Sequence, residues 1–140
     1  MRFVAIVAVL MLAGCVSSSL EPSQADLKAQ WEARNIPPLD YKSDIIALMR
    51  TYLNDPNGVR SAGVSPPQRK TVIGEPDERF ITCVRFDARK TSGDYAGVKT
   101  GAAVYVSGKL DRFLDTPRVV EALCKDAAYQ PFPELERLRR

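Results

Sequence analysis

The most reactive side chains in the sequence are three cysteines, at positions 15, 83 and 124, and the sequence contains no histidine. Cysteine can form disulfides, ligate metals or act as a nucleophile. The lack of histidine removes Ser-His-Asp and Cys-His nucleophilic sites, and it removes the commonest zinc ligand. Cys83 and Cys124 are also too far apart in sequence for a Cys-x-x-Cys redox pair. We therefore expect the cysteines to serve covalent structure rather than catalysis.

Acidic residues gather around the segments that we predict to be loops: Glu75, Asp77, Glu78, Asp87 and Asp94. Paired carboxylates can cleave glycans by acid–base chemistry. The spacing here indicates no such pair, because acidic residues beside glycine and proline are typical of solvated loops. The chain also lacks the glycine-rich motifs that bind phosphate. We therefore predict no active site, no cofactor and no metal site.

The first residues have the order of a secretory signal. Met1 and Arg2 give a cationic start, and Phe3 to Leu12 are all apolar. A spanning helix needs about 20 apolar residues to cross roughly 30 Å of hydrocarbon, and Ser17 to Ser19 end this run too early. We predict that residues 1–14 are removed as a signal peptide.

The end of this segment, Leu12-Ala13-Gly14-Cys15, resembles the lipobox of bacterial lipoproteins. The resemblance implies diacylglycerol on the Cys15 thiol, cleavage before Cys15 and acylation of the new amine. Each buried CH₂ contributes about 0.8 kcal/mol, so two or three acyl chains would hold the protein firmly on a membrane. Val16 follows the cysteine, and by resemblance a residue other than Asp favours the outer membrane. The alternative is an ordinary signal peptide with a chance cysteine.

Lipidation of Cys15 would leave Cys83 and Cys124 as an even pair in a compartment where disulfides persist. We predict that these two cysteines are bonded to each other. In the chain-entropy model, a bridge that closes a loop of this length stabilises the domain by about 4 kcal/mol. The alternative is two separate buried thiols.

Length and composition favour one small domain on a tether. The formal net charge of +3 gives no electrostatic reason to expect nucleic acid as a partner. We expect a signal peptide at 1–14, a partly disordered tether at 15–37, a periplasmic domain at 38–130 and a charged C-terminal tail at 131–140. Prolines at 37, 38, 131 and 133 set the boundaries of the domain.

Hydrophobic periodicity predicts an α+β fold, a small antiparallel sheet of three or four strands packed by an N-terminal and a C-terminal helix. We expect helices at 23–34, 41–53 and 117–128, with Asp40 and Thr116 as caps. We expect strands at 59–64, 79–89, 98–106 and 110–114, loops at 65–76 and 90–97, and a tight turn at Ser107-Gly108. A bond between Cys83 and Cys124 would pin the last helix to the sheet.

The segment at 91–97 has the most individual sequence among the predicted loops and contains Ser92, Gly93, Asp94, Tyr95 and Gly97. The simpler reading is a connection in which the glycines supply positive φ and Tyr95 packs on the sheet edge. A functional reading is a binding loop, because Ser-Gly followed closely by Tyr is similar to the inhibitory loop of periplasmic lysozyme inhibitors. That resemblance implies that Ser92 and Tyr95 enter a lysozyme cleft. The inhibitor family forms an eight-stranded barrel, however, and the two strong helix signals here depart from it.

A second resemblance covers about 41–114. Asp55-Pro56, Cys83-Val84 and the Gly93–Gly97 segment look like a pattern in small uncharacterised secreted proteins of proteobacteria. This resemblance brings no known activity, so it supports the fold more than the function.

The function that we expect is that of a membrane-anchored envelope lipoprotein, a non-enzymatic structural or interaction module. It would contact another envelope protein, or a partner associated with peptidoglycan, through its sheet edge or through Tyr129 to Leu135. The alternative is a periplasmic lysozyme-inhibitor-like binding protein that acts through residues 91–97.

Overall fold

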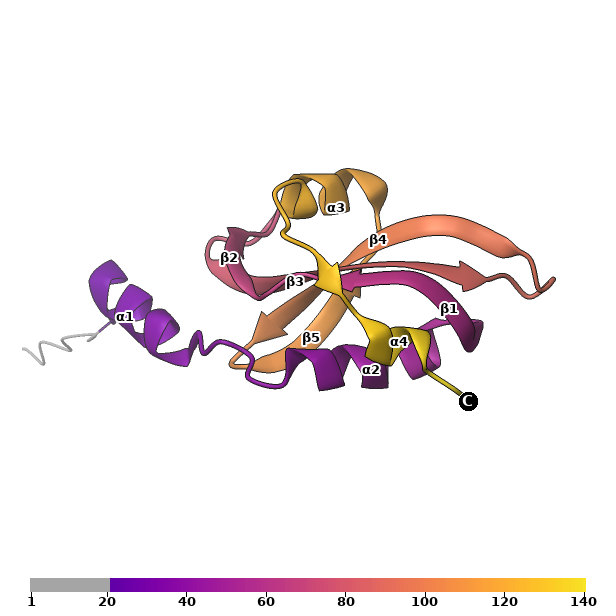
Figure 1. Cartoon of the computed structure of the whole chain (residues 1–140). Helices are drawn as coiled ribbons and strands as arrows, with labels where there is room; N and C mark the ends of the chain where they lie inside the picture. The colour runs from indigo at the N-terminus through magenta and orange to yellow at the C-terminus, as the bar shows by residue number, and fades with distance from the viewer. Residues whose placement is uncertain (1–20) are drawn as a thin grey trace, which may run out of the picture.

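The computed structural model describes residues 21–140, so Cys15 and the predicted signal segment lie outside the described residues. The described chain is an α+β domain built on one six-stranded antiparallel sheet (Figure 1). The helices are α1 (Gln24–Arg34), α2 (Tyr41–Tyr52), α3 (Pro117–Cys124) and α4 (Pro133–Glu136). The strands are β1 (Asp55–Val64), β2 (Gln68–Thr71), β3 (Glu78–Arg89), β4 (Tyr95–Val106), β5 (Lys109–Leu114) and β6 (Gln130–Pro131).

The sheet is organised around β3. Its strand order is β5-β4-β3-β1-β6, and β2 pairs with the first residues of β3 beyond the end of β1. β4 pairs with β3 along nearly its whole length, with Val84 opposite Gly101 and Phe80 opposite Tyr105. The sheet is therefore larger than the three or four strands that we predicted.

The two strands that the sequence did not reveal are short and polar. β2 has the sequence QRKT, has no fully buried residue and lies in a segment that we predicted to be a loop between prolines. β6 has two exposed residues, and one of them is Pro131. Proline is tolerated there because β6 is an edge strand.

One face of the sheet is covered by α2 and α4, which lie below it in Figure 1. Ile45 and Met49 of α2 are fully buried and belong to the same apolar cluster as Val84, Phe86 and Tyr105 of the sheet. These sheet residues alternate along their strands with residues that face the other way, which is the period of two expected of a pleated strand.

The opposite face is covered by α3. Val120, Leu123 and Cys124 of α3 form a second cluster with strand residues that include Ile81 and Val104. Cys83 of β3 and Cys124 of α3 form a disulfide with a Cα–Cα distance of 5.8 Å, so the predicted pairing is confirmed. The bond joins α3 covalently to the central strand.

Two turns show how local sequence sets the backbone. Ser107 and Gly108 both have positive φ, at 51° and 75°, and they join β4 to β5 as the predicted tight hairpin. Gly58 and Ser61 also have positive φ, at 72° and 54°, and the register between β1 and β3 shifts at these residues. Residues 55–58 are therefore an irregular start of β1.

The last ten residues are part of the folded domain, which corrects the predicted tail at 131–140. Phe132 and Leu135 are fully buried, and Leu138 is 3% exposed. These three residues recur every third position, so one side of the short α4 segment is apolar although charged residues dominate its composition. The Glu136 side chain also accepts a hydrogen bond from the N–H of Ala62 in β1 at 3.0 Å.

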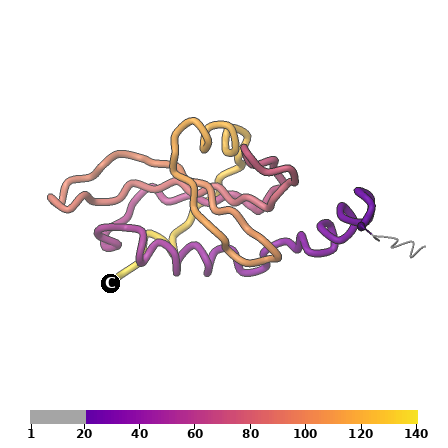
Figure 2. Tube along the Cα trace, turned by 180° about the vertical axis from the view of Figure 1, so that it is seen from behind, coloured from indigo at the N-terminus to yellow at the C-terminus, as the bar shows by residue number. Residues whose placement is uncertain are grey.

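The helix α1 extends from one end of the domain, and the β3–β4 hairpin and the C-terminus lie at the other end (Figures 1 and 2). Ser23 and Asp26 form a capping box at the start of α1, and none of its residues is buried. Trp31 touches the domain, with its ring centroid 5.7 Å from Arg69 and 5.6 Å from Arg79. Glu32 adds an ion pair to Arg69 at 2.8 Å. Within residues 21–140, no helix has the length and hydropathy to cross a membrane.

The buried C-terminal stripe predicts a large effect of one substitution. Leu135→Ala should lower the free energy of unfolding by about 2–5 kcal/mol, because it removes buried methyl groups and leaves a cavity. Leu39→Ala is the matched control, because Leu39 is 86% exposed and its replacement should change stability little. Urea unfolding followed by circular dichroism measures both values. Equal stability of the two variants would contradict the assignment of residues 131–140 to the core.

Candidate functional site

The predicted loop at 90–97 is shorter in the structure, because β4 already begins at Tyr95. Ser92, Gly93 and Asp94 lie exposed at the tip of the β3–β4 hairpin, where Ser92 Oγ donates to Asp94 Oδ2 at 3.2 Å. Gly93 and Gly97 have φ of 92° and 90°, as the simpler reading of this segment predicted. The tip thus behaves as a connection between strands.

Tyr95 joins the base of this hairpin to β1. Its hydroxyl donates to the carbonyl oxygen of Gly58 at 2.7 Å, and the side chain is half-buried. The guanidinium of Arg60 lies 3.6 Å from the centroid of the Tyr95 ring, and that of Arg89 lies 5.4 Å away. Stacking and hydrogen bonding together fix the position of this ring.

Asp87 is a buried carboxylate beside Tyr95. It lies within β3 opposite Arg60 and is 4% exposed. It accepts hydrogen bonds from Arg60 Nε at 2.8 Å and from the N–H of Gly97 at 2.9 Å. The sequence placed Asp87 among loop carboxylates, whereas the structure gives it a structural role in holding β1, β3 and β4 together.

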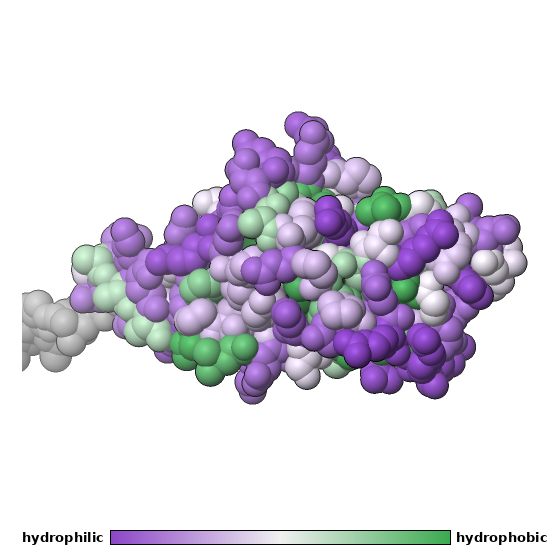
Figure 3. Space-filling view, in the orientation of Figure 1, coloured by the Kyte–Doolittle hydropathy of each residue, from purple (hydrophilic) through white to green (hydrophobic). Residues whose placement is uncertain are grey.

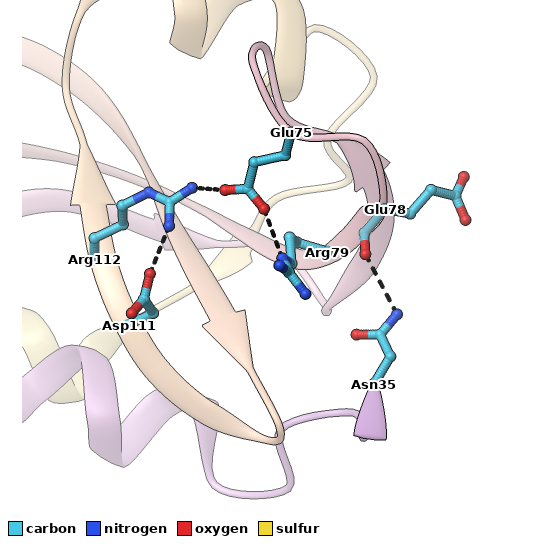
Figure 4. Close-up of polar contacts among 6 residues, drawn as sticks. All are labelled: Asn35, Glu75, Glu78, Arg79, Asp111 and Arg112. Carbon is cyan, nitrogen blue, oxygen red and sulfur yellow. Dashed lines mark hydrogen bonds and ion pairs between the residues drawn. The ribbon is translucent and has the colours of Figure 1, made fainter. Parts of the chain in front are cut away.

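Glu75 lies in an ion-pair cluster at the other end of the sheet (Figure 4). Its carboxylate accepts from Arg79 Nε at 2.6 Å and also pairs with Arg112, which in turn pairs with Asp111. Glu78 pairs with Arg69 at 3.2 Å, and its carbonyl oxygen accepts from the side chain of Asn35. These carboxylates are engaged by arginines, and residues 21–140 contain no group of three side chains suited to hold a metal ion.

A groove of about 660 Å³ lies between α3 and β4. Most of its wall is apolar or aromatic, and the disulfide-bonded Cys124 is part of that wall. The lining residues are Tyr52, Phe86, Val98, Lys99, Thr100, Phe113, Asp115, Pro117, Val120, Glu121, Cys124, Lys125 and Tyr129. Grooves of this size and composition are where proteins usually bind small molecules or chain segments.

One side of the groove is an open strand edge. β5 ends at Leu114 opposite Ala102, so the outer edge of β4 from Tyr95 to Gly101 has no strand partner within residues 21–140. Val98 on this edge is 60% exposed. The open edge ends at Gly101, where the ring of Phe113 packs against the strand. A Cβ at this position would lie 2.1 Å from that ring, so glycine is needed for the ring to approach.

The polar groups of the groove lie at its rim. Tyr52 donates to Asp115 Oδ2 at 2.8 Å. Partial burial, and secondly the hydrogen bond and charge of Asp115, raise the pKa of Tyr52 to about 12. Lys99, Glu121 and Lys125 are exposed and form no ion pair within 4 Å among the described residues.

This arrangement can bind an extended chain segment. An edge strand offers unpaired backbone N–H and C=O groups, and an apolar groove beside it can take alternate side chains of an added strand. The sequence predicted β4 but not the groove, because the lining residues come from α2, β3, β4, β5, α3 and the segment after α3. The unequal lengths of the predicted strands at 98–106 and 110–114 were the one local signal that part of β4 would extend beyond β5.

No family model matches the chain, and the searches of curated proteins and of solved structures also gave no match.

The hydrogen bond between Tyr52 and Asp115 predicts a specific titration. Because the pKa of Tyr52 is raised from 10 to about 12, the neutral phenol should contribute stability below pH 10 and lose it as the pH rises through 12. The difference in phenolate absorbance between the wild type and Tyr52→Phe should therefore titrate near pH 12. Asp115→Asn should move this pKa down toward 10. A wild-type difference curve centred at pH 10 would contradict the bond.

Proposed function

We propose that this chain is a lipid-anchored lipoprotein of the bacterial envelope and acts as a non-enzymatic interaction module. Its partner is another envelope protein, and the module binds an extended segment of it along the open edge of β4. The observation that carries the proposal is the coincidence of the unpaired strand edge at Tyr95–Gly101 with the apolar groove.

The chemistry of the edge favours a strand as the occupant. An added strand would satisfy backbone groups of β4 that have no strand partner on their outer side, and its inward side chains would enter the groove between Phe113 and Val120. Burial of apolar area contributes roughly 25 cal/mol per Å² and would supply most of the affinity. Lys99 on the same edge keeps copies of the chain from pairing there, because two such edges would bring like charges close together.

The other contact surface that we considered, Tyr129 to Leu135, is less suited to a partner. Phe132 and Leu135 are fully buried against the sheet, and Tyr129 is half-buried beside Arg85, whose guanidinium lies 4.8 Å from its ring centroid. The apolar side chains of this segment are already used within the domain.

The anchor rests on the resemblance of Leu12 to Cys15 to a lipobox. Acyl chains on Cys15 would place α1 next to the membrane, since the eight residues from 16 to 23 reach at most about 28 Å when fully extended. The outer membrane is the proposed location, because Val16 follows the cysteine.

The lysozyme-inhibitor alternative stays a prediction, and no observation favours it. Tyr95 would have to enter a lysozyme cleft, whereas its hydroxyl is bonded to Gly58 and its ring lies against Arg60. Ser92 remains exposed at the hairpin tip.

The proposed anchor predicts that the chain incorporates labelled palmitate in growing cells and fractionates with the outer membrane. Cys15→Ser should incorporate no label, because the thiol that accepts the diacylglycerol is gone. Label in the Cys15→Ser variant, or an unprocessed and unlabelled wild-type chain, would contradict the anchor.

The proposed binding edge predicts position-specific cross-linking in intact cells. A photoreactive residue at Val98 should give a discrete adduct with one envelope protein, and the same residue at Ile73 should not. Ile73 is the matched control, because it is also apolar and is 67% exposed, compared with 60% for Val98, but does not line the groove. Identical adducts at both positions, or none at Val98, would count against the groove as the binding site.

A further inference from the structure

Four arginine side chains gather at the end of the domain opposite α1. Arg50 lies in the last turn of α2, Arg89 ends β3, and Arg139 and Arg140 follow α4. Arg50 Nη1 donates to the carbonyl oxygen of Arg139 at 3.1 Å, and Arg140 Nη2 donates to that of Asn54 at 3.2 Å. All four are exposed, and Figure 3 shows a strongly hydrophilic surface where α4 and the C-terminus lie in Figure 1.

These arginines differ from those at the other end of the domain. Near α1, Arg69, Arg79 and Arg112 pair with glutamates. In contrast, none of the four arginines at the far end has a carboxylate within 4 Å among residues 21–140. Arg69, Arg79 and Arg112 are therefore paired near α1, whereas the four arginines at the far end have no ion pair among residues 21–140.

The acidic side chain that lies among these arginines is Asp55. Hydrogen bonds from Asn57 lower the pKa of Asp55, and the charges of Arg89 and Arg140 lower it further. Asp55 Oδ1 accepts from both the main-chain and the side-chain nitrogen of Asn57, each at 2.9 Å. Asp55 balances one of the four guanidinium charges, and the carboxylate of Glu136 in α4 is turned to the N–H of Ala62.

The arginines are also held in place for binding. Arg50 and Arg140 are each restrained by a hydrogen bond to a main-chain carbonyl oxygen. A guanidinium has five N–H donors, and each of these two arginines uses one of them in that bond. The remaining donors can bind an oxyanion in the bidentate geometry that guanidinium favours. Restraint of the free side chain reduces the entropy that is lost when the anion binds.

We propose that this arginine end binds the carboxylates of the cell-wall glycopeptide. The choice of the cell-wall glycopeptide over the phosphates of a membrane rests on the proposed function. With Cys15 lipidated, α1 would lie next to the membrane, and the arginines lie at the opposite end of the domain (Figures 1 and 2). Trp31 and Glu32 hold α1 against the domain, so a molecule that stands on α1 presents the arginine end away from the membrane. The wall polymer carries free carboxylates on its peptides and lies on the side that faces away from the anchor.

The test is co-sedimentation of the purified full chain, in non-ionic detergent, with isolated wall sacculi. Wild-type chain should bind, and the binding should weaken as salt is raised. Arg139→Gln/Arg140→Gln should raise the apparent Kd roughly tenfold or more, because two charge-assisted contacts are lost. Arg34→Gln/Arg118→Gln should bind as the wild type does, because both residues are exposed arginines away from this end.

Several results would overturn the proposal. The first is a wild-type chain that does not bind sacculi, and the second is an Arg139/Arg140 variant that binds as tightly as the wild type. The third is an equal loss of affinity in the two double variants, which would indicate that net charge alone drives binding. A parallel arm uses vesicles of phosphatidylglycerol. Binding to these vesicles with no binding to sacculi would identify a phosphate surface and refute the wall polymer. Palmitate labelling and cross-linking at Val98 test the anchor and the groove separately, so failure here is distinguishable from failure of the proposed function.

Discussion

The antiparallel pairing of β3 with β4 is the interaction on which the rest of the structure depends. β3 is flanked by β4 on one side and by β1 and β2 on the other, and both of its faces are buried. Alternating residues of this strand reach α2 and α4 on one face and α3 on the other. The disulfide between Cys83 and Cys124 fixes α3 to β3, the strand that also pairs with β1, β2 and β4. A change of register by one residue would exchange the two cores, so each contact reinforces the others.

The same arrangement creates the surfaces to which we assign function. β4 is twice as long as β5, with 12 residues compared with 6, so part of its outer edge extends beyond its neighbour. α3 is held above that edge by Cys124, and the space between them is the groove. The hairpin base is fixed by Tyr95 and Asp87, which makes the open edge a rigid template rather than a mobile loop. Rigid edges bind strands with a smaller loss of entropy.

Much of the fold could be predicted from local pattern, and the remainder depends on tertiary contacts. Alternation in 79–89 and 98–106, the Ser107-Gly108 turn and the stripe on 41–53 identified β3, β4, the hairpin and α2. Reasoning from cysteine chemistry correctly paired Cys83 with Cys124. Polar β2 and two-residue β6 have no periodicity of their own, and they form because β3 and β1 offer edges to pair with. The burial of Leu135 and Leu138 could not be predicted, because the charged residues around them are typical of a solvated tail. The groove could not be predicted, because its walls come from segments that are distant in sequence.

Backbone hydrogen exchange at the edge of β4 tests the central claim most directly. In dilute purified chain, amides of Val98–Gly101 that point away from β3 should exchange rapidly, whereas those of Ala102–Val104 should be protected between β3 and β5. Nuclear magnetic resonance resolves these amides one by one. Uniform protection from Val98 to Val106 would show that the edge is already occupied, and it would contradict the account of a binding site there.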